Sequence, residues 1–370
     1  MKLARLYLVT LAAAIVTCSA VLAGPYSLAT ADPTNPYDAG VPGFVGPDGD
    51  GVVSANNYVN PALVGWASAV TDYSPAPGLD AKWTSSAKTL GPVTGDYLDV
   101  ASLGDLTQSQ IDGGTAPGRV TLSFDVPIHN GAGADLAVFE NAYMVGDYTF
   151  AELGYVEVST DGVNFARFPS VSLTESLVGA YGNIDATDVY NLAGKHVNHE
   201  GTSFGTPFDL QTLADDPMVV GEQVDLSEIN YVRIVDIPGS GDFLDAASPA
   251  NPIYDAWWTW GSGGVDLEAI GALHQGIAGD TDWDGDVDNV DFGALYGSFT
   301  GPEGAGMTWQ QGNFDYDGDV DNVDFGTLYG CYTGPLAGGA FDGAIVPEPV
   351  TVGVLVLAAA GALIRRRTTG

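Results

Sequence analysis

The chain has 370 residues and a formal net charge of −36 at pH 7, with 47 acidic against 11 basic side chains. This balance argues against a nucleic acid as partner, because phosphate binding requires a basic face. Hydrophobic residues make up 45% of the chain, which predicts a folded core rather than a disordered acidic polymer. The 50 glycines and 21 prolines indicate short strands and many turns.

The N-terminal segment is typical of an export signal. Lys2 and Arg5 precede a mostly apolar run that ends in small residues. Cleavage fits before Gly24, after "VLA", or before Asp32, after "ATA". We assign residues 1–31 to the signal peptide, and the alternative is an N-terminal membrane anchor.

Residues 32–275 are predicted to form a β domain. The stretch "YVEVSTDGVNFARF" alternates on both sides of Asp161-Gly162, which predicts a β-hairpin with a type I′ turn. Tyr155, Glu157 and Ser159 are expected on one face of its first strand, with Val156 and Val158 on the other. Further strands are predicted over Arg119 to Val126, Ala134 to Asn141, Ile229 to Ile237 and Val265 to His274.

Many short strands separated by Gly, Pro and Asp turns indicate a mainly β fold, a β-sandwich of jelly-roll type. The hairpin "S-x-DG-x-x-F", the strand "YVRI" and the closing strand "LEAIG" resemble the discoidin-like, galactose-binding-like sandwiches. The stretches "GRVTLSFDVPIHNGAGADLAVFEN" and "FAELGYVEVSTDG" resemble a family of exported bacterial surface proteins with no assigned activity. These resemblances imply a fold and an exported setting, but no chemistry.

Two aspartate-rich dodecamers follow, "DTDWDGDVDNVD" from residue 280 and "NFDYDGDVDNVD" from residue 313. Each places side-chain oxygens at positions 1, 3, 5, 9 and 12, glycine at position 6 and a backbone carbonyl at position 7, which is the pattern of a calcium loop. Because Ca²⁺ takes six to eight oxygen ligands, it explains why so many like charges stand together. We predict two Ca²⁺ ions, bound by Asp280, Asp282, Asp284, Asp286, Asp288 and Asp291 and by Asn313, Asp315, Asp317, Asp319, Asp321 and Asp324.

The two loops depart from the EF-hand pattern in having Asp at position 12 and no helix before the loop. Helices are predicted only after them, from Val290 to about Phe299 and from Val323 to about Tyr332. This arrangement over residues 276–334 resembles a type I dockerin module, which implies a cohesin-like protein partner. Glycines in the helices and the lack of Lys and Arg depart from that family, and a calcium-stiffened stalk is the alternative. In dockerins loop positions 10 and 11 contact the partner, and here they are Asn289, Val290, Asn322 and Val323.

The C-terminal segment reads as a sorting signal after a linker over residues 335–345. A Pro-Glu-Pro motif, a short apolar stretch and an arginine cluster resemble the PEP-CTERM signal of exported bacterial proteins. The resemblance implies an exosortase-type protease, extracellular polysaccharide and a cell-surface location with at least a transient membrane anchor. The predicted signal includes a short transmembrane segment, and the alternative is an ordinary C-terminal membrane anchor. The signal spans residues 346–370 and includes Pro347, Glu348, Pro349, Arg365, Arg366 and Arg367.

The loop "YDAWWTWGSGG" carries the candidate carbohydrate-binding residues. Trp257, Trp258 and Trp260 could stack on sugar faces at the rim of the sandwich. In the alternative, alternation buries Trp258, and Trp257 and Trp260 cover the end of a sheet. A second candidate is a structural calcium ion that clips loops of the sandwich together; otherwise its acids are solvated turn residues. That candidate set is Asp135, Glu140, Asn141, Asp236, Asp242 and Asp245.

Catalytic patterns are weak in this chain. Glu140, Glu152 and Glu157 qualify as glycosidase acids by residue type only. No G-x-S-x-G elbow is present, and "HVNHE" is a weak metal motif. The preferred interpretation is a non-catalytic, calcium-binding surface protein that associates with extracellular polysaccharide. The alternative is a polysaccharide-acting hydrolase that carries a dockerin-like module.

Overall fold

The computed structural model describes residues 24–47, 53–259, 263–315 and 317–334. The chain divides into two compact units between Gly276 and Ile277, named here the β domain and the acidic-repeat domain. Within the described ranges, no helix combines the length and hydrophobicity needed to cross a bilayer. Predicted segments outside these ranges are the export signal up to residue 23, the linker, and the sorting signal with Pro347, Glu348, Pro349, Arg365, Arg366 and Arg367.

The structure is mainly β with antiparallel pairing, which confirms the predicted fold class at that level. The larger sheet has the strand order β1-β16-β8-β18-β4, and the short strands β15 and β6 pair with β16 and β18. Its strands are β1 (Val41–Pro42), β16 (Thr202–Phe208), β8 (Leu136–Glu140), β18 (Asp266–Ala272), β4 (Gly65–Trp66), β15 (Asn198–His199) and β6 (Ala101–Ser102).

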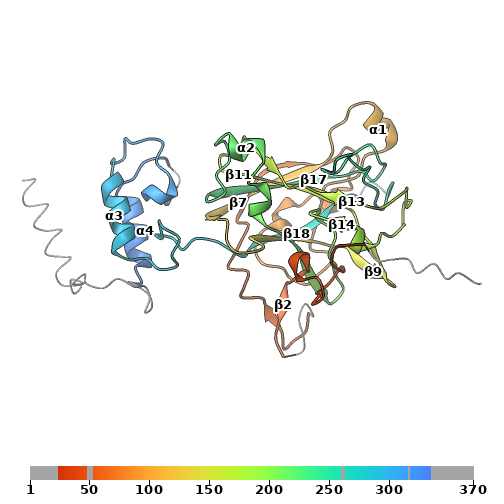
Figure 1. The fold of residues 1–370 in the computed structure, drawn as a ribbon, viewed down its shortest axis with the longest axis horizontal. Coiled ribbons are helices and arrows are strands. Elements are labelled where there is room, and N and C mark those ends of the chain that lie inside the picture. The colour runs from red at the N-terminus through yellow and green to blue at the C-terminus, as the bar shows by residue number, and fades with distance from the viewer. Residues whose placement is uncertain (1–23, 48–52, 260–262, 316, 335–370) are drawn as a thin grey trace, which may run out of the picture. The chain divides into compact units, whose positions relative to one another are not determined.

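A second sheet of five strands has the order β12-β11-β17-β7-β5. Figure 1 labels its strands β11, β17 and β7. Its central strands β17 and β7 pair over most of their length, with a register shift between Ile229 and Tyr231. The strands are β12 (Ala166–Arg167), β11 (Gly154–Ser159), β17 (Ile229–Asp236), β7 (Arg119–Ile128) and β5 (Ala69–Ser74).

Three two-stranded ladders and short helices complete the β domain. The ladders pair β2 (Phe44–Val45) with β3 (Tyr58–Val59), β9 (Tyr143–Val145) with β10 (Tyr148–Phe150), and β13 (Val171–Ser172) with β14 (Val189–Tyr190). The helices are α1 (Gln108–Asp112), α2 (Pro217–Val220) and the 3₁₀ turns Pro36–Asp38, Ala81–Trp83, Ser86–Thr89, Ala186–Asp188 and Leu210–Leu213.

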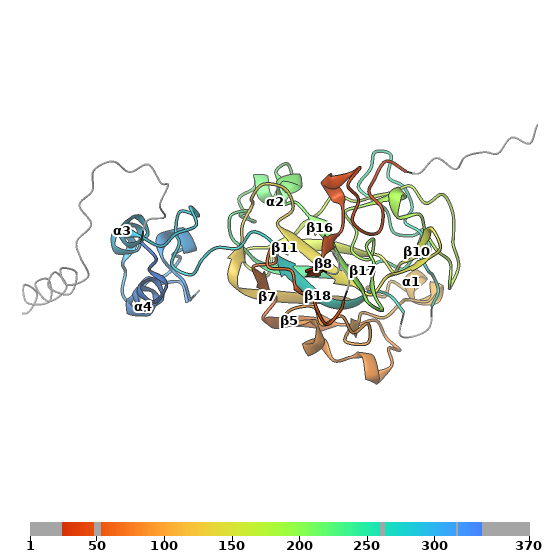
Figure 2. The same ribbon diagram turned by 90° about the horizontal axis from the view of Figure 1, so that it is seen from below.

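The main core lies between the two sheets, as alternation along the strands predicts. Leu122 of β7 and Ile234 of β17 belong to one buried cluster with Val138 of β8 and Ile270 of β18. The ribbons of these four strands are labelled in Figure 2. All six residues of β11 are buried, because a second cluster around Tyr155 covers its outer face. The prediction that Val156 and Tyr155 lie on opposite faces of β11 is therefore confirmed, but neither face is exposed to solvent.

The predicted hairpin forms between β11 and β12, but its turn is not type I′. The strands pair through Glu157 with Arg167, so the connection is longer than two residues. A type I′ turn needs positive φ at both central residues, and only Gly162, with φ of 74°, has it. The Asp161 carboxylate instead accepts hydrogen bonds from the backbone N–H groups of Val163 and Asn164, both at 2.8 Å.

Residues 24–31, which the signal-peptide prediction includes, are part of the folded β domain. The Gly24 N–H donates to Thr187 Oγ1 at 2.7 Å, and the Tyr26 N–H donates to the Thr187 carbonyl at 3.1 Å. Ser27 is fully buried, and its hydroxyl donates to the Asp38 carbonyl at 2.6 Å. Cleavage before Gly24 keeps these contacts, whereas cleavage before Asp32 removes them.

The acidic-repeat domain consists of two similar loop-helix units. Helices α3 (Asn289–Ser298) and α4 (Asn322–Cys331) lie side by side, and a 3₁₀ turn (Trp309–Gln311) connects the repeats (Figure 1). The Phe292 ring meets the Phe325 ring edge-on, with centroids 6.1 Å apart. Among the described residues of this domain, the buried hydrophobic side chains are Val287, Leu295, Trp309, Phe314, Val320 and Leu328.

Candidate metal centres

Each aspartate-rich loop is shaped by hydrogen bonds from its own backbone. In the first loop, Asp280 Oδ1 accepts from the Trp283 N–H at 2.7 Å and Oδ2 accepts from the Gly285 N–H at 3.0 Å. Gly285 and Gly318, at position 6 of the two loops, have φ of 90° and 92°. Because side chains other than glycine rarely adopt this conformation, the sequence places glycine where the chain must turn back.

The aspartate at position 12 ties each loop to its helix. Asp291 Oδ1 accepts from the Thr281 N–H at 2.6 Å, and Oδ2 accepts from the Asp288 N–H at 2.7 Å. Asp324 repeats this with the N–H groups of Phe314 at 2.6 Å and Asp321 at 2.9 Å. Each aspartate is thus the N3 member of a capping box whose N-cap is Asp288 or Asp321. This explains why the helices start one residue before the predicted positions.

The carboxylates of these loops come close together. Ligand oxygens from three acids at a time lie within 4.8 Å of one another, which is the spacing that a shared cation requires. Burial raises the pKa of Asp280 to about 6, and the charges of Asp291 and Asp282 contribute. The groups are Asp280 with Asp282 and Asp284, Asp286 with Asp288 and Asp291, and Asp319 with Asp321 and Asp324.

The second loop has buried side-chain oxygens, one neutral and one charged, that accept no hydrogen bond from a described residue. Asn313 is 4% exposed; its Nδ2 donates to the Met307 carbonyl at 2.9 Å, while its buried Oδ1 accepts no hydrogen bond. Asp319 Oδ1 is likewise buried without a donor. Such acceptors are costly in a folded protein unless an ion or water supplies the missing contact. The residues therefore fit a hard cation with oxygen ligands.

The two repeats support each other's loops. The Val320 N–H of the second loop donates to Thr300 Oγ1, after α3, at 3.0 Å. The Val287 N–H of the first loop donates to Thr333 Oγ1, after α4, at 2.9 Å. Trp309, buried between the repeats, donates its indole N–H to the Asp280 carbonyl at 2.7 Å. Each loop therefore depends on the opposite repeat.

The predicted partner-contact residues are exposed. Asn289 and Val290 begin α3, and Asn322 and Val323 occupy the same positions in α4. Further exposed rings follow at matching places, Tyr296 with Tyr329 and Phe299 with Tyr332, a repetition that had not been predicted. The identical continuation "DFG-x-LYG" after each loop could have identified the first pair, because Tyr296 and Tyr329 fall outside the buried stripe of Leu295 and Leu328.

In the β domain, the described tryptophans have different environments. Trp257 is half-buried, and its indole N–H donates to the Leu106 carbonyl at 3.0 Å. Trp258 is 39% exposed. Trp260 lies outside the described residues. The alternative that buries Trp258 is therefore wrong, and Trp258 is the described tryptophan best placed for stacking.

The acids proposed for a loop-clipping calcium ion do not gather as one set. Asp135 binds the His274 ring at 2.7 Å, and Asp245 accepts from the backbone N–H groups of Ser172 and Asn251. Asp242 is bonded to Gln108 at the surface. Glu140 and Asp236, in contrast, lie buried at the ends of β8 and β17.

The remaining candidates for chemistry have structural roles. Glu157 bonds with Arg167 at 2.7 Å and Arg233 at 3.4 Å. His196 is buried between Ser27 and Thr206, and His199 contacts the Tyr97 and Tyr143 rings. The described residues do not bring His196, His199 and Glu200 together as a metal group.

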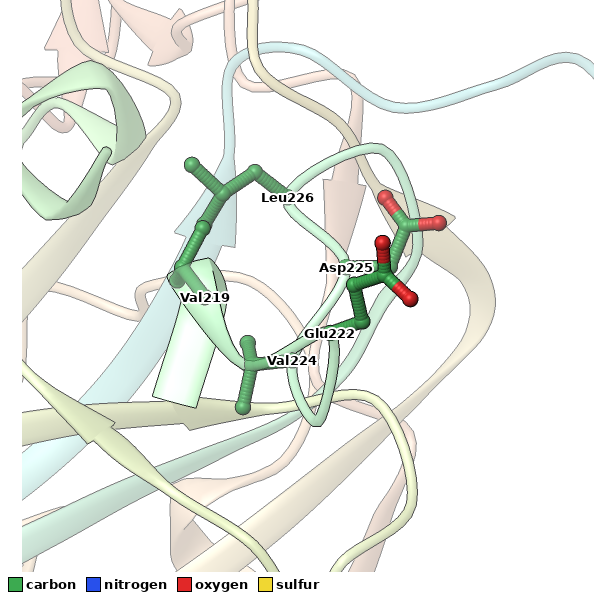
Figure 3. Close-up of a pocket in the computed structure, with 5 residues that line it drawn as sticks. All are labelled: Val219, Glu222, Val224, Asp225 and Leu226. Atoms are coloured by element: carbon green, nitrogen blue, oxygen red, sulfur yellow. The ribbon is translucent and has the colours of Figure 1, made fainter. Parts of the chain in front are cut away.

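A hollow of about 570 Å³ follows helix α2 (Figure 3). Its apolar side is formed by Val219, Val224 and Leu226, and the carboxylates of Glu222 and Asp225 lie together on the other side. It contains no residue that the sequence predicts to bind a ligand.

Comparisons of the chain with protein-family models, with curated proteins and with solved structures find no match.

Proposed function

We propose that the chain is an exported, non-catalytic surface protein that binds two calcium ions through its acidic-repeat domain. The observation that carries this proposal is the convergence of loop carboxylates within 4.8 Å in both repeats. The closely spaced charges repel one another in the absence of a cation, and a divalent ion converts that repulsion into ligation. Backbone hydrogen bonds to Asp280, Asp291 and Asp324 hold the ligands in place beforehand.

In this proposal the calcium-loaded repeats dock onto a cohesin-like partner. The support is the duplicated, exposed set formed by Val290 with Val323 and by Tyr296 with Tyr329. A partner with one apolar groove could bind either copy, since the two repeats present the same side chains. A rigid spacer needs calcium but needs no exposed tyrosines, so the docking role accounts for more of the surface.

The β domain is proposed to be a galactose-binding-like sandwich that associates with extracellular polysaccharide. The support is its two packed antiparallel sheets and the exposed ring of Trp258. Export is inferred from the signal-like N-terminal segment. Sorting by an exosortase-type protease is inferred from the resemblance of the C-terminal segment to the PEP-CTERM signal. A signal peptide that ends at Ala23 agrees with the contacts made by Gly24 and Ser27.

The hydrolase alternative is less well supported by the positions of its candidate acids. Glu140 is 1% exposed and Glu152 is 6% exposed, so neither carboxyl faces solvent, from which a sugar would have to bind. Burial raises the pKa of both carboxyls well above the ordinary value, and nearby carboxylates raise it further. A glycosidase requires one of the pair to be ionised.

Calcium titration of the full chain by calorimetry and far-ultraviolet circular dichroism tests the proposal. We expect two ions in the acidic repeats and a gain of helical signal. Asp284→Ala should remove the first ion and Asp317→Ala the second, whereas the exposed Asp215→Ala should change neither. Unaltered calcium binding after the combined Asp284→Ala and Asp317→Ala change would refute the assignment.

A glycan array combined with a reducing-sugar assay tests the β domain in the same chain. Retention without turnover, weakened by Trp258→Ala, supports a binding role. Release of reducing sugar that stops on Glu152→Gln would show that the hydrolase alternative is correct.

A further inference from the structure

Acids from both sheets meet at one end of the β domain. Glu140 is the last residue of β8, and Asp266 is the first residue of the neighbouring strand β18. Their strands pair through Leu267 and Glu140. In the other sheet, Asp236 ends β17 opposite Gly154, the first residue of β11. The topology therefore brings the ends of four strands, and the loops beside them, close together: the Val265 N–H donates to Asp236 Oδ1 and the Asp266 N–H donates to Glu140 Oε1.

Three loop acids complete this group, named here the strand-end cluster. Glu152 precedes β11 and accepts from Thr259 Oγ1 at 2.8 Å and from the Gly264 N–H at 3.0 Å. Asp105 accepts from the Thr259 N–H at 3.3 Å, and Asp255 accepts from the Leu153 N–H at 2.6 Å. The members of the strand-end cluster are Asp105, Glu140, Glu152, Asp236, Asp255 and Asp266.

No basic side chain in the described ranges neutralises this cluster. Every Lys and Arg there forms an ion pair with an acid outside the cluster: Lys82 with Asp80, Lys88 with Asp99, Arg119 with Asp72, Lys195 with Asp38, and Arg167 and Arg233 with Glu157. The other five basic residues of the chain are at positions 2, 5 and 365–367. The charge of the cluster must be balanced by protons or by a cation, because buried unpaired carboxylates are very costly.

Several carboxylate oxygens of the cluster have no hydrogen-bond donor. Asp105 is 6% exposed and Asp236 is 1% exposed, and Oδ1 of Asp105 and Oδ2 of Asp236 are buried without a described partner. Asp266 Oδ1 is a third such atom. Burial is the largest cause that raises the pKa of Asp236. The charges of Asp105 and Asp266 raise it further, so these acids interact electrostatically. Hydrogen-bond acceptors without a partner, on acids that interact with one another, indicate a missing cation.

We propose that the strand-end cluster binds a hard divalent cation, and that in an exported protein this ion is calcium. The site is separate from the acidic repeats, and only the choice of calcium rests on the proposed export. In the described residues, no three cluster acids have ligand oxygens within 4.8 Å of one another. The ion therefore keeps water ligands between carboxylates, unlike an ion in the acidic loops. Its role is structural, because it links the ends of both sheets.

Counting bound calcium separates this site from the acidic repeats. The full chain and a loop variant with Asp282→Ala, Asp284→Ala, Asp315→Ala and Asp317→Ala are dialysed against calcium, and the metal is measured by atomic emission. We expect three ions per full chain and one ion per loop variant. If the acidic repeats bind nothing, both proteins hold the same single ion. If the strand-end cluster binds nothing, the full chain holds two ions and the loop variant holds none.

Substitution then places the remaining ion. In the loop variant, Asp236→Asn together with Asp266→Asn should weaken calcium binding at least tenfold, whereas Asp215→Ala should not. Because these changes could impair folding, a second measurement uses the loop variant with its strand-end cluster intact. Calcium should raise the unfolding midpoint of the loop variant by several degrees. A loop variant that melts at the same temperature in calcium and in EGTA would overturn the proposal.

Discussion

The two acidic clusters of this molecule are built in opposite ways. Each acidic repeat takes its carboxylates from twelve consecutive residues, and each loop orients them through backbone hydrogen bonds such as that from the Gly285 N–H to Asp280. The strand-end cluster takes its acids from residues as distant as Asp105 and Asp266, which only the pairing of β18 with β6 and β8 brings together.

This difference affects what each cluster does without a cation. The loops are partly open to solvent, so their charges are screened, and we expect the domain to lose mainly local order when no cation is present. The strand-end cluster is enclosed, so its carboxyls have to keep protons when no ion is present. Calcium should therefore act on the shape of the acidic-repeat domain and on the stability of the β domain.

The largest expected effect of a single substitution is that of Trp309→Ala. Trp309 is 1% exposed and binds the Asp280 carbonyl, so its loss removes the core between the repeats and a support of the first loop. We expect a destabilisation of about 3–5 kcal/mol in saturating calcium, measured by thermal unfolding of the acidic-repeat transition. Tyr296→Ala, at a side chain that is 73% exposed, is the control and should change little. Equal effects of the two changes would contradict the packing described here.

A pH series in EGTA tests how the strand-end cluster is balanced when no cation is bound. Burial raises the pKa of Asp105 and of Asp266 to about 7. Because the folded state holds these protons more tightly, the stability they provide is present in full below about pH 4 and is lost as the pH rises through about 7. The unfolding temperature of the β domain in EGTA should thus decrease as the pH rises from 5 to 8. Saturating calcium should remove this decrease. A midpoint in EGTA that is constant over this range would show that the acids are balanced in another way.

Cross-support between the repeats predicts an effect that crosses from one repeat to the other. Thr333→Val removes the acceptor of the Val287 N–H, so it should weaken calcium binding in the first loop. Thr300→Val should weaken the second loop through Val320 in the same way. Each change should cost about 1 kcal/mol. Thr327→Ala is the control, since the first repeat has alanine at the matching position 294. Site-resolved calcium titration that shows each change acting only on its own repeat would disprove the cross-support.

The smallest expected effects concern the helix glycines. Gly293 and Gly326 lie inside α3 and α4, and a Cβ atom at either position meets no neighbour within 4 Å. Gly293→Ala and Gly326→Ala should each stabilise the calcium-loaded domain by about 0.5–1 kcal/mol. Gly285→Ala has equal space but a φ of 90°, so it should destabilise by about 1–2 kcal/mol. Chemical denaturation measures all three, and a stabilising Gly285→Ala would contradict the turn assigned to the loop.

Sequence reasoning worked best where a structure depends on neighbouring residues. The helices after both loops and the strands β7, β8, β17 and β18 lie close to their predicted positions, because alternation and capping are local signals. The type I′ turn at Asp161 was wrong, because the Asp161 carboxylate stabilises a longer connection. Sequence reasoning named only Glu140 and Asp236 of the strand-end cluster, in a set that does not gather, and it missed the covered outer face of β11. Both features depend on which distant strands become neighbours.

An experimental structure of the calcium-loaded chain, with an anomalous difference map, would locate calcium in the acidic repeats. We expect one peak in each loop, surrounded by side-chain oxygens at about 2.3–2.6 Å. In the first loop these oxygens should include those of Asp280, Asp282, Asp284, Asp288 and Asp291. Loops without a peak at saturating calcium, with their carboxylates directed into solvent, would contradict this expectation.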